Sequence, residues 1–228
     1  MLMAQSASYG LLKSSIGKKV FMALTGLFLC LFLVGHLAGN LQLFIPGEAG
    51  QIQFNKYAEF MTTNPLVKIL SYVTYFSILF HVFDGLALTI KNRKARPQRY
   101  HYKKDGANSI WSSRNMGVLG TVILVFIVLH MSNFWFKMHF GDIGVDAEGR
   151  KDLYTVVAAS FEQLWYVAVY AISMVAIGFH LWHGFASGFQ SLGVNHSAYN
   201  PIIHGFGKVF SVVVPLGFAI IPIYMYLT

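Results

Sequence analysis

Cysteine is almost absent from this sequence, since Cys30 is the only one among 228 residues. One thiol cannot close a disulfide within the chain, and it cannot hold an iron–sulfur cluster or the paired thioether bonds of a c-type haem. A fold stabilised by disulfides within the chain is therefore excluded. Any redox cofactor of this chain must be held by other side chains.

Charge is also scarce, because only 11% of the residues are charged, against about 25% in soluble domains. Hydrophobic residues make up 55% of the chain and fall into five long blocks. Each block is close to the roughly 20 residues that cross a hydrocarbon core of about 30 Å. The composition excludes a soluble domain and predicts an all-α integral membrane protein with five transmembrane helices.

The predicted spans form a single membrane domain over residues 1–228, and they cover about 20–44, 66–90, 115–136, 164–189 and 209–227. Residues 1–19 precede the first span and contain three lysines, which is typical of a cytoplasmic lead-in. The first span is longer than the apolar core of a signal peptide, about 7–15 residues. We therefore expect it to be a membrane helix.

The net charge of +8 comes from basic residues that lie between the apolar blocks. With the N-terminus in the cytoplasm, twelve of the seventeen lysines and arginines face inward, most of them in the loop 91–114. Seven of the nine acidic residues then face outward. This distribution obeys the positive-inside rule, so membrane topology explains the charge and no nucleic-acid partner is expected.

Histidine is the ionisable residue that recurs inside the spans. His36 lies in the first span, His81 in the second and His130 in the third, while the fourth contains His180 and His183. Ionisable groups are costly in a bilayer and mark functional sites by default. Each histidine taken alone is equally well explained as a core side chain bonded to a neighbouring helix.

The depths of four histidines weaken that simpler explanation. His36 and His130 lie 17 and 16 residues from basic residues at the cytoplasmic side, or about 25 Å at 1.5 Å per residue. His81 and His180 lie ten residues from the same side, or about 15 Å. Two levels with two imidazoles each are what two haems require, with one axial ligand on either side of each iron. Zinc fits less well, because it needs four ligands at one point.

His183 and Asp84 are secondary candidates beside these levels. His183 shares a helix face with His180, but the depth of His180 matches that of His81. His183 is placed where it can hydrogen-bond a haem propionate. Asp84 follows His81 on the same face and either handles protons or pairs with the basic loop. Glycines flank the histidines, and they either admit a flat macrocycle or serve ordinary helix packing.

Four stretches of the sequence carry a family resemblance. They are TGLFLCLFLVGHLAGNLQLF at 25–44, FHVFDGLALTIKNRKARPQRY at 80–100, VLH at 128–130 and GFHLWHGFASGFQSLG at 178–193. Together they resemble the di-haem cytochrome b subunit of bacterial succinate dehydrogenase and fumarate reductase. The resemblance covers nearly the whole chain, including the number of spans and the long basic loop. It implies four axial ligands, paired His36 with His130 and His81 with His180.

The resemblance also implies a function. Such a chain anchors a flavoprotein subunit and an iron–sulfur subunit to the cytoplasmic face of the bacterial inner membrane. Through two b haems, it passes electrons between the succinate site of the partners and a membrane quinone such as menaquinone. The succinate reaction belongs to the tricarboxylic acid cycle and to the respiratory chain. FAD, the iron–sulfur clusters and the dicarboxylate site belong to the partners, so no catalytic residue is expected on this chain. Quinone is expected near the outer haem, between the ends of the first three spans, with no residue assigned.

Two other functions remain open at this point. The cytochrome b subunit of a formate dehydrogenase or a hydrogenase also needs histidine ligands to haem. A transporter that uses histidines for protons or metal is a third function, and it predicts a colourless protein. The basic loop 91–114 is expected to help dock the soluble subunits, unless it serves only insertion or contact with anionic lipids.

Overall fold

The computed structural model describes residues 14–95 and 109–228, and within these ranges the chain is helical with no strand. Five helices are long and apolar enough to cross a membrane. They are α1 (Ser15–Asn40), α3 (Pro65–Lys94), α5 (Met116–His130) with its continuation, α8 (Leu164–Ser191) and α9 (Asn200–Leu227). The prediction of an all-helical chain with five candidate spans is confirmed. Most of the cytoplasmic lead-in, residues 1–13, and the middle of the basic loop, residues 96–108, lie outside the described residues.

The helices extend past the predicted spans, because capping residues rather than hydropathy determine where a helix ends. The first helix begins at Ser15, where the hydroxyl of Ser14 accepts a hydrogen bond from the Gly17 N–H at 2.9 Å. The last begins at Asn200, nine residues before the predicted span, with a proline in its first turn. Proline is favoured there because the missing N–H has no partner within the helix.

The third span is not a uniform α-helix. After His130 it passes through the π-helical segment η3 (Met131–Trp135) and ends in α6 (Phe136–Phe140). A π-helical turn is wider than an α-helical one, and such turns occur often at functional sites. The sequence did not predict this segment, which begins directly after a candidate ligand.

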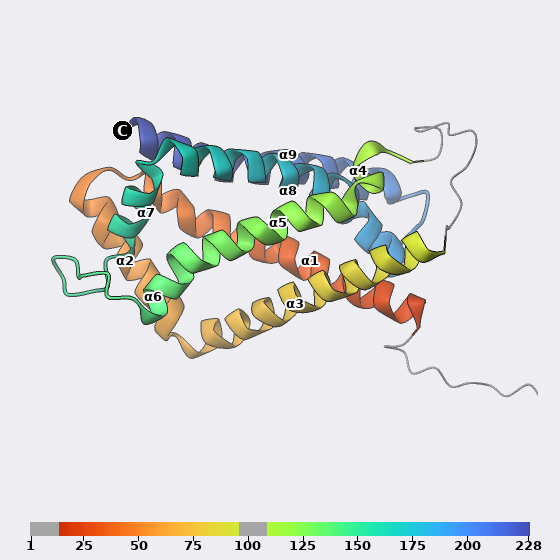
Figure 1. Ribbon diagram of the computed structural model, residues 1–228, viewed down its shortest axis with the longest axis horizontal. Coiled ribbons are helices and arrows are strands. Elements are labelled where there is room, and N and C mark those ends of the chain that lie inside the picture. Colours follow the sequence, from red (N-terminus) through yellow and green to blue (C-terminus); the bar gives the residue numbers. More distant parts are fainter. Residues whose placement is uncertain (1–13, 96–108) are drawn as a thin grey trace, which may run out of the picture.

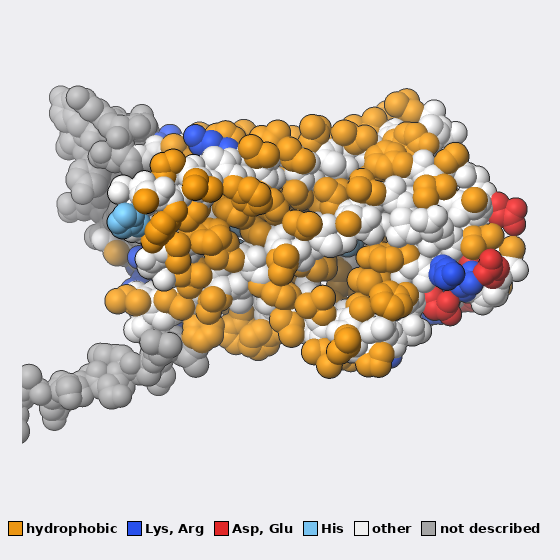
Figure 2. All heavy atoms as spheres, turned by 180° about the vertical axis from the view of Figure 1, so that it is seen from behind, with side chains coloured by type: hydrophobic (Ala, Val, Ile, Leu, Met, Phe, Trp, Pro, Cys, Tyr) orange, Lys and Arg blue, Asp and Glu red, His pale blue; other side chains and the backbone are white. Residues whose placement is uncertain are grey.

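The two ends of the molecule differ in charge and in structure. Short helices η2 (Leu41–Phe44), α2 (Gly47–Thr63) and α7 (Leu153–Phe161) gather with α6 at one end (Figure 1). We call it the acidic end, because the loop 141–152 there carries acidic side chains (Figure 2). The opposite, basic end carries α4 (Trp111–Arg114) and the end of α3. Hydrophobic side chains cover the surface between the two ends (Figure 2). The sequence predicts that the acidic end faces outward.

The five long helices are unequally buried. Within the most apolar stretch of each, 39% of the residues of α8 and 33% of those of α9 are buried, against 17%, 11% and 17% in α1, α3 and α5. Helices α1 and α5 both pack on α8 but hardly on each other. The bundle therefore consists of an α8–α9 pair and an α1–α3 pair, with α1 and α5 packed on α8 and with α1, α3 and α5 more exposed at the surface.

A glycine accounts for the close approach of α8 to α9. Pro215 has no N–H, so the carbonyl of Ser211 one turn earlier lacks its usual partner within the helix. A Cβ atom at Gly178 would lie 3.1 Å from that carbonyl oxygen. Glycine at this position lets the two backbones meet, which explains one glycine beside His180 by packing alone.

A buried polar cluster joins α2 to the loop 141–152 and to α7. Asn55 is 0% exposed, and its amide donates to Asp152 Oδ1 at 2.9 Å and to Asp146 Oδ2 at 3.4 Å. Its carbonyl oxygen accepts from the Tyr154 N–H at 2.9 Å. Asp152 also caps α7 by accepting from the Thr155 N–H. We call Asn55, Asp146 and Asp152 the polar latch.

Replacing Asn55 by alanine leaves the buried Tyr154 N–H without its acceptor and removes one hydrogen bond from each of Asp146 and Asp152, which costs about 2–3 kcal/mol. We expect Asn55→Ala to lower the free energy of unfolding of the detergent-solubilised chain by about this amount. Gln53→Ala, at an exposed position of the same helix, serves as the matched control. Equal free energies of unfolding of the two variants would show that the polar latch does not stabilise the fold.

The latch also makes stability depend on pH. Burial alone would raise the pKa of Asp146, but hydrogen bonds from the backbone N–H groups of Arg150 and Glu148 outweigh it and lower the pKa below its usual 3.8. Burial would likewise raise the pKa of Asp152. Hydrogen bonds from Thr155 and Asn55 outweigh burial and lower this pKa as well. A carboxylate with a depressed pKa stabilises the folded state above its ordinary pKa, and this contribution is lost as the pH falls through the folded value.

We therefore expect the acidic end to loosen below about pH 4, before the long helices do. Hydrogen exchange of residues 142–161, followed against pH, measures this directly. In the double variant Asp146→Asn/Asp152→Asn the exchange of this segment should no longer change over that range. The prediction would be contradicted if residues 142–161 stayed equally protected from hydrogen exchange at neutral pH and far below the ordinary carboxylate pKa.

Candidate functional site

The structure brings His36 of α1 and His130 of α5 together near the acidic end. Their ring centroids are 5.7 Å apart and their planes are perpendicular, at 90°. Phe32 stacks on His36 from one side, and Phe218 of α9 lies 5.5 Å from it between centroids. His36 is therefore held by aromatic packing and by a hydrogen bond that the Asn40 amide donates to its Nδ1 at 3.5 Å.

His81 of α3 and His180 of α8 form a second pair nearer the basic end. Their ring centroids are 6.0 Å apart, with 67° between the planes. The four histidines thus meet two by two, and each comes from a different helix. No three His, Cys, Asp or Glu side chains gather as a metal cage anywhere in residues 14–95 or 109–228.

The spacing within each pair suits one interposed iron atom. A bond from a metal to an imidazole nitrogen is about 2 Å long, so two axial nitrogens on opposite sides of an iron are about 4 Å apart. The distance from each nitrogen to its ring centre adds roughly 1 Å, which puts the centroids about 6 Å apart. Both observed pairs are close to this separation, and all four rings are half-buried.

Hydrogen bonds indicate which ring nitrogen is available in His81. Its Nδ1 lies 3.4 Å from the hydroxyl of Thr25, and that hydroxyl donates to the Phe21 carbonyl at 2.8 Å. Since the single hydroxyl hydrogen is already used, Thr25 accepts from His81. The proton then sits on Nδ1, and Nε2 is the nitrogen with a free lone pair for a metal.

His130 is oriented by a tyrosine that the sequence did not single out. The hydroxyl of Tyr170 lies 2.9 Å from His130 Nδ1, a good hydrogen-bond length. A partner of this kind on the second nitrogen fixes the ring of a metal-binding histidine. A hydroxyl inside an apolar span was the only signal in the sequence that pointed to Tyr170.

His180 offers the clearest test of whether the residues fit a bound group. Its Nδ1 is buried and has no hydrogen-bond partner among the residues that the structure describes. A buried polar atom without a partner costs about 1–3 kcal/mol, and such atoms in a folded protein call for an explanation. A bound group that reaches Nδ1 would supply the missing partner.

The glycines near the histidines divide into two groups. A Cβ at Gly39 would lie 2.4 Å from the Tyr57 hydroxyl, so this glycine, like Gly178, serves packing between helices. A Cβ at Gly35 would meet nothing within 4 Å, and one at Gly184 would meet only a methionine methyl at 4.0 Å. Gly35 and Gly184, and Gly85 with only a methionine methyl at 3.6 Å, therefore have space beside them that close helix packing does not fill.

The secondary candidates stay less defined. His183 is half-buried and makes no ring contact with His81 or His180. Asp84 forms no ion pair with any residue in the described ranges. Much of the basic loop with which Asp84 was expected to pair lies outside these ranges. The roles of His183 and Asp84 stay predictions.

Comparison with known protein families, curated proteins and solved structures gave no match.

The two-level arrangement can be checked without any cofactor. In a Cys30→Ser background, we expect a short bifunctional thiol reagent to cross-link His36→Cys to His130→Cys, because these positions face each other. His36→Cys combined with His180→Cys is the matched control and should cross-link much less. Mass spectrometry of the digested chain measures both products, and similar yields from the two combinations would contradict the arrangement.

Proposed function

We propose that this chain is the membrane-anchor and electron-transfer subunit of a succinate:quinone oxidoreductase and holds two b-type haems. The observation that carries the proposal is that histidines from four helices meet as two pairs, at centroid distances of 5.7 and 6.0 Å. With one cysteine in the chain, the haems are held by imidazoles alone. A bound haem supplies reversible one-electron exchange.

The protein contributes position and a dry environment. His36 and His130 would hold one haem, and His81 and His180 would hold the other. Thr25 and Tyr170 keep two of these rings oriented by hydrogen bonds to Nδ1. Phe126 and Phe134 pack near His130, with centroids 5.8 and 5.4 Å away, and keep water from the ring.

The charge distribution supports an assignment of the partners. Basic side chains at the basic end include Lys91, Arg93 and Lys94 in the last turn of α3. We assign docking of the iron–sulfur and flavoprotein subunits to this end, which the positive-inside rule places in the cytoplasm. Haems held at the His81–His180 and His36–His130 levels would supply one-electron exchange between the partner subunits and a quinone.

Haem counting tests the proposal. The purified chain should contain two non-covalent haems by pyridine haemochrome analysis. His36→Ala or His130→Ala should remove one, and His81→Ala or His180→Ala the other, because a haem with one axial ligand is weakly held. His183→Ala is the matched control, three residues from His180 on the same helix, and it should keep both haems.

Several outcomes would contradict the proposal. One haem or none in the wild-type chain would exclude the two-pair assignment, and a colourless chain would favour a transporter. Loss of haem in His183→Ala but not in His180→Ala would reverse the choice of ligand. Purification of the intact complex identifies the partners, and a molybdenum or nickel enzyme in place of a flavoprotein would contradict the succinate assignment.

A further inference from the structure

A cavity of about 270 Å³ lies near the acidic end, beside the His36–His130 level. Its walls come from α5 and η3, from the end of α7, and from the start of α8. They combine apolar with polar side chains, namely Leu129, Trp165, Asn133, Ser160, Gln163 and Tyr166. Ser132 also lines the cavity, and apolar surface beside several hydrogen-bonding groups suits a small molecule that carries both. Leu129 directly precedes His130, so the cavity adjoins the candidate ligand.

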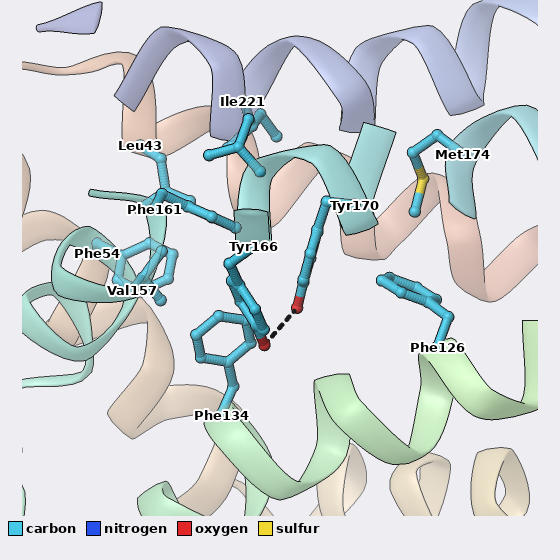
Figure 3. Close-up of a cluster of buried hydrophobic side chains, with 11 residues drawn as sticks. Leu43, Phe54, Phe126, Phe134, Val157, Phe161, Tyr166, Tyr170, Met174 and Ile221 are labelled. Atoms are coloured by element: carbon cyan, nitrogen blue, oxygen red, sulfur yellow. Dashed lines mark hydrogen bonds between the residues drawn. The ribbon is translucent and has the colours of Figure 1, made fainter. Parts of the chain in front are cut away.

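A chain of hydrogen bonds connects this cavity to His130. The hydroxyl of Tyr166 lies 3.4 Å from that of Tyr170 (Figure 3), and the hydroxyl of Tyr170 lies 2.9 Å from His130 Nδ1. Phe134 and Phe161 pack around the two tyrosines. The chain is thus enclosed by aromatic rings, where a polar group without a partner is costly.

The direction of the hydrogen bonds follows from metal binding by His130. When Nε2 binds iron, Nδ1 carries the proton and donates to the Tyr170 oxygen. Tyr170 then donates its own hydrogen to Tyr166. The oxygen of Tyr166 also accepts from the Asn133 amide at 3.2 Å, whose other hydrogen goes to Ser160 at 2.8 Å.

The hydroxyl hydrogen of Tyr166 is therefore left over. With Nδ1 of His130 donating to Tyr170 and Tyr170 donating to Tyr166, neither Tyr170 nor Asn133 accepts this hydrogen, and no other acceptor for it is found in the described residues. Since Tyr166 lines the cavity, the cavity contains a hydrogen-bond donor directed by the same chain that orients His130. Such a donor matches an acceptor oxygen on a lipid-soluble molecule.

We propose that this cavity binds the ring of a quinone, whose carbonyl oxygen accepts a hydrogen bond from Tyr166. The inference rests on the proposed electron-transfer function and assigns residues to its quinone site. Trp165 and Leu129 are exposed on the bundle surface, so a ring enters from the lipid and its apolar tail stays outside. The site lies beside the third and fourth spans, rather than between the ends of the first three, where the sequence placed it.

The test is photolabelling of the full chain with its haems by an azido-naphthoquinone, with menadione as competitor. We expect label on residues 129–133 and 160–166, removed by menadione. Tyr166→Phe should raise the quinone concentration for half-maximal labelling about fivefold, the effect of one lost hydrogen bond. Tyr224→Phe is the matched control, because it removes a tyrosine hydroxyl that donates to Phe44 elsewhere in the bundle, and it should leave labelling unchanged.

A second variant keeps the test decisive. Ser160→Leu fills the cavity and should abolish the competed label. Haem is counted on every preparation, so that a variant that fails to fold is recognised. If Ser160→Leu fails to fold, the labelling of Tyr166→Phe, which keeps the aromatic ring, decides whether the cavity binds quinone. Label that menadione does not displace, or that Tyr166→Phe and Ser160→Leu leave unchanged, would overturn the inference.

The same counts separate this inference from the proposed function. Two haems in a chain without competed label in these segments would overturn the quinone site alone. Competed label in a chain that binds no haem would support the cavity as a quinone site and overturn the electron-transfer function.

Discussion

The structure depends on one constraint, which is that a polar atom in a bilayer must find its partner inside the protein. The backbone meets it by forming helices, but an imidazole within a helix has two nitrogens that still need partners. Thr25 and Tyr170 each provide for one nitrogen, while Nδ1 of His180 is left without a partner among the described residues. The second nitrogen of each ring is what makes a pair of facing histidines a site for a metal.

The unequal packing of the helices is suited to such a site. Helices α8 and α9 bury the largest share of their apolar residues, and α8 also contacts α1 and α5. A rigid α8 can therefore fix the positions of His180 and Tyr170 together. The more exposed helices α1, α3 and α5 supply the other three histidines.

The sequence allows histidines of different helices to be matched by level because the rise per residue in a helix is constant. His36 and His130 were expected at one depth, and in the structure their rings face each other. The lateral arrangement was not predictable in the same way. Whether the hydroxyl of Tyr170 reaches His130 depends on how α8 is rotated against α5, and hydropathy contains no information about rotation. The latch around Asn55 was missed for the same reason, since its partners lie some 90 to 100 residues later in the chain.

The difference in depth between the two pairs has an energetic consequence under the proposed function. Moving one charge across the whole membrane costs or yields about 2.3 kcal/mol per 100 mV. The two levels differ by about 10 Å in a hydrocarbon core of about 30 Å, so transfer between them spans roughly a third of that potential. One haem close to the partner subunits would serve a quinone at the basic end without this contribution. A second pair nearer the acidic end is useful because it delivers electrons to the opposite side, where the membrane potential helps or opposes each transfer.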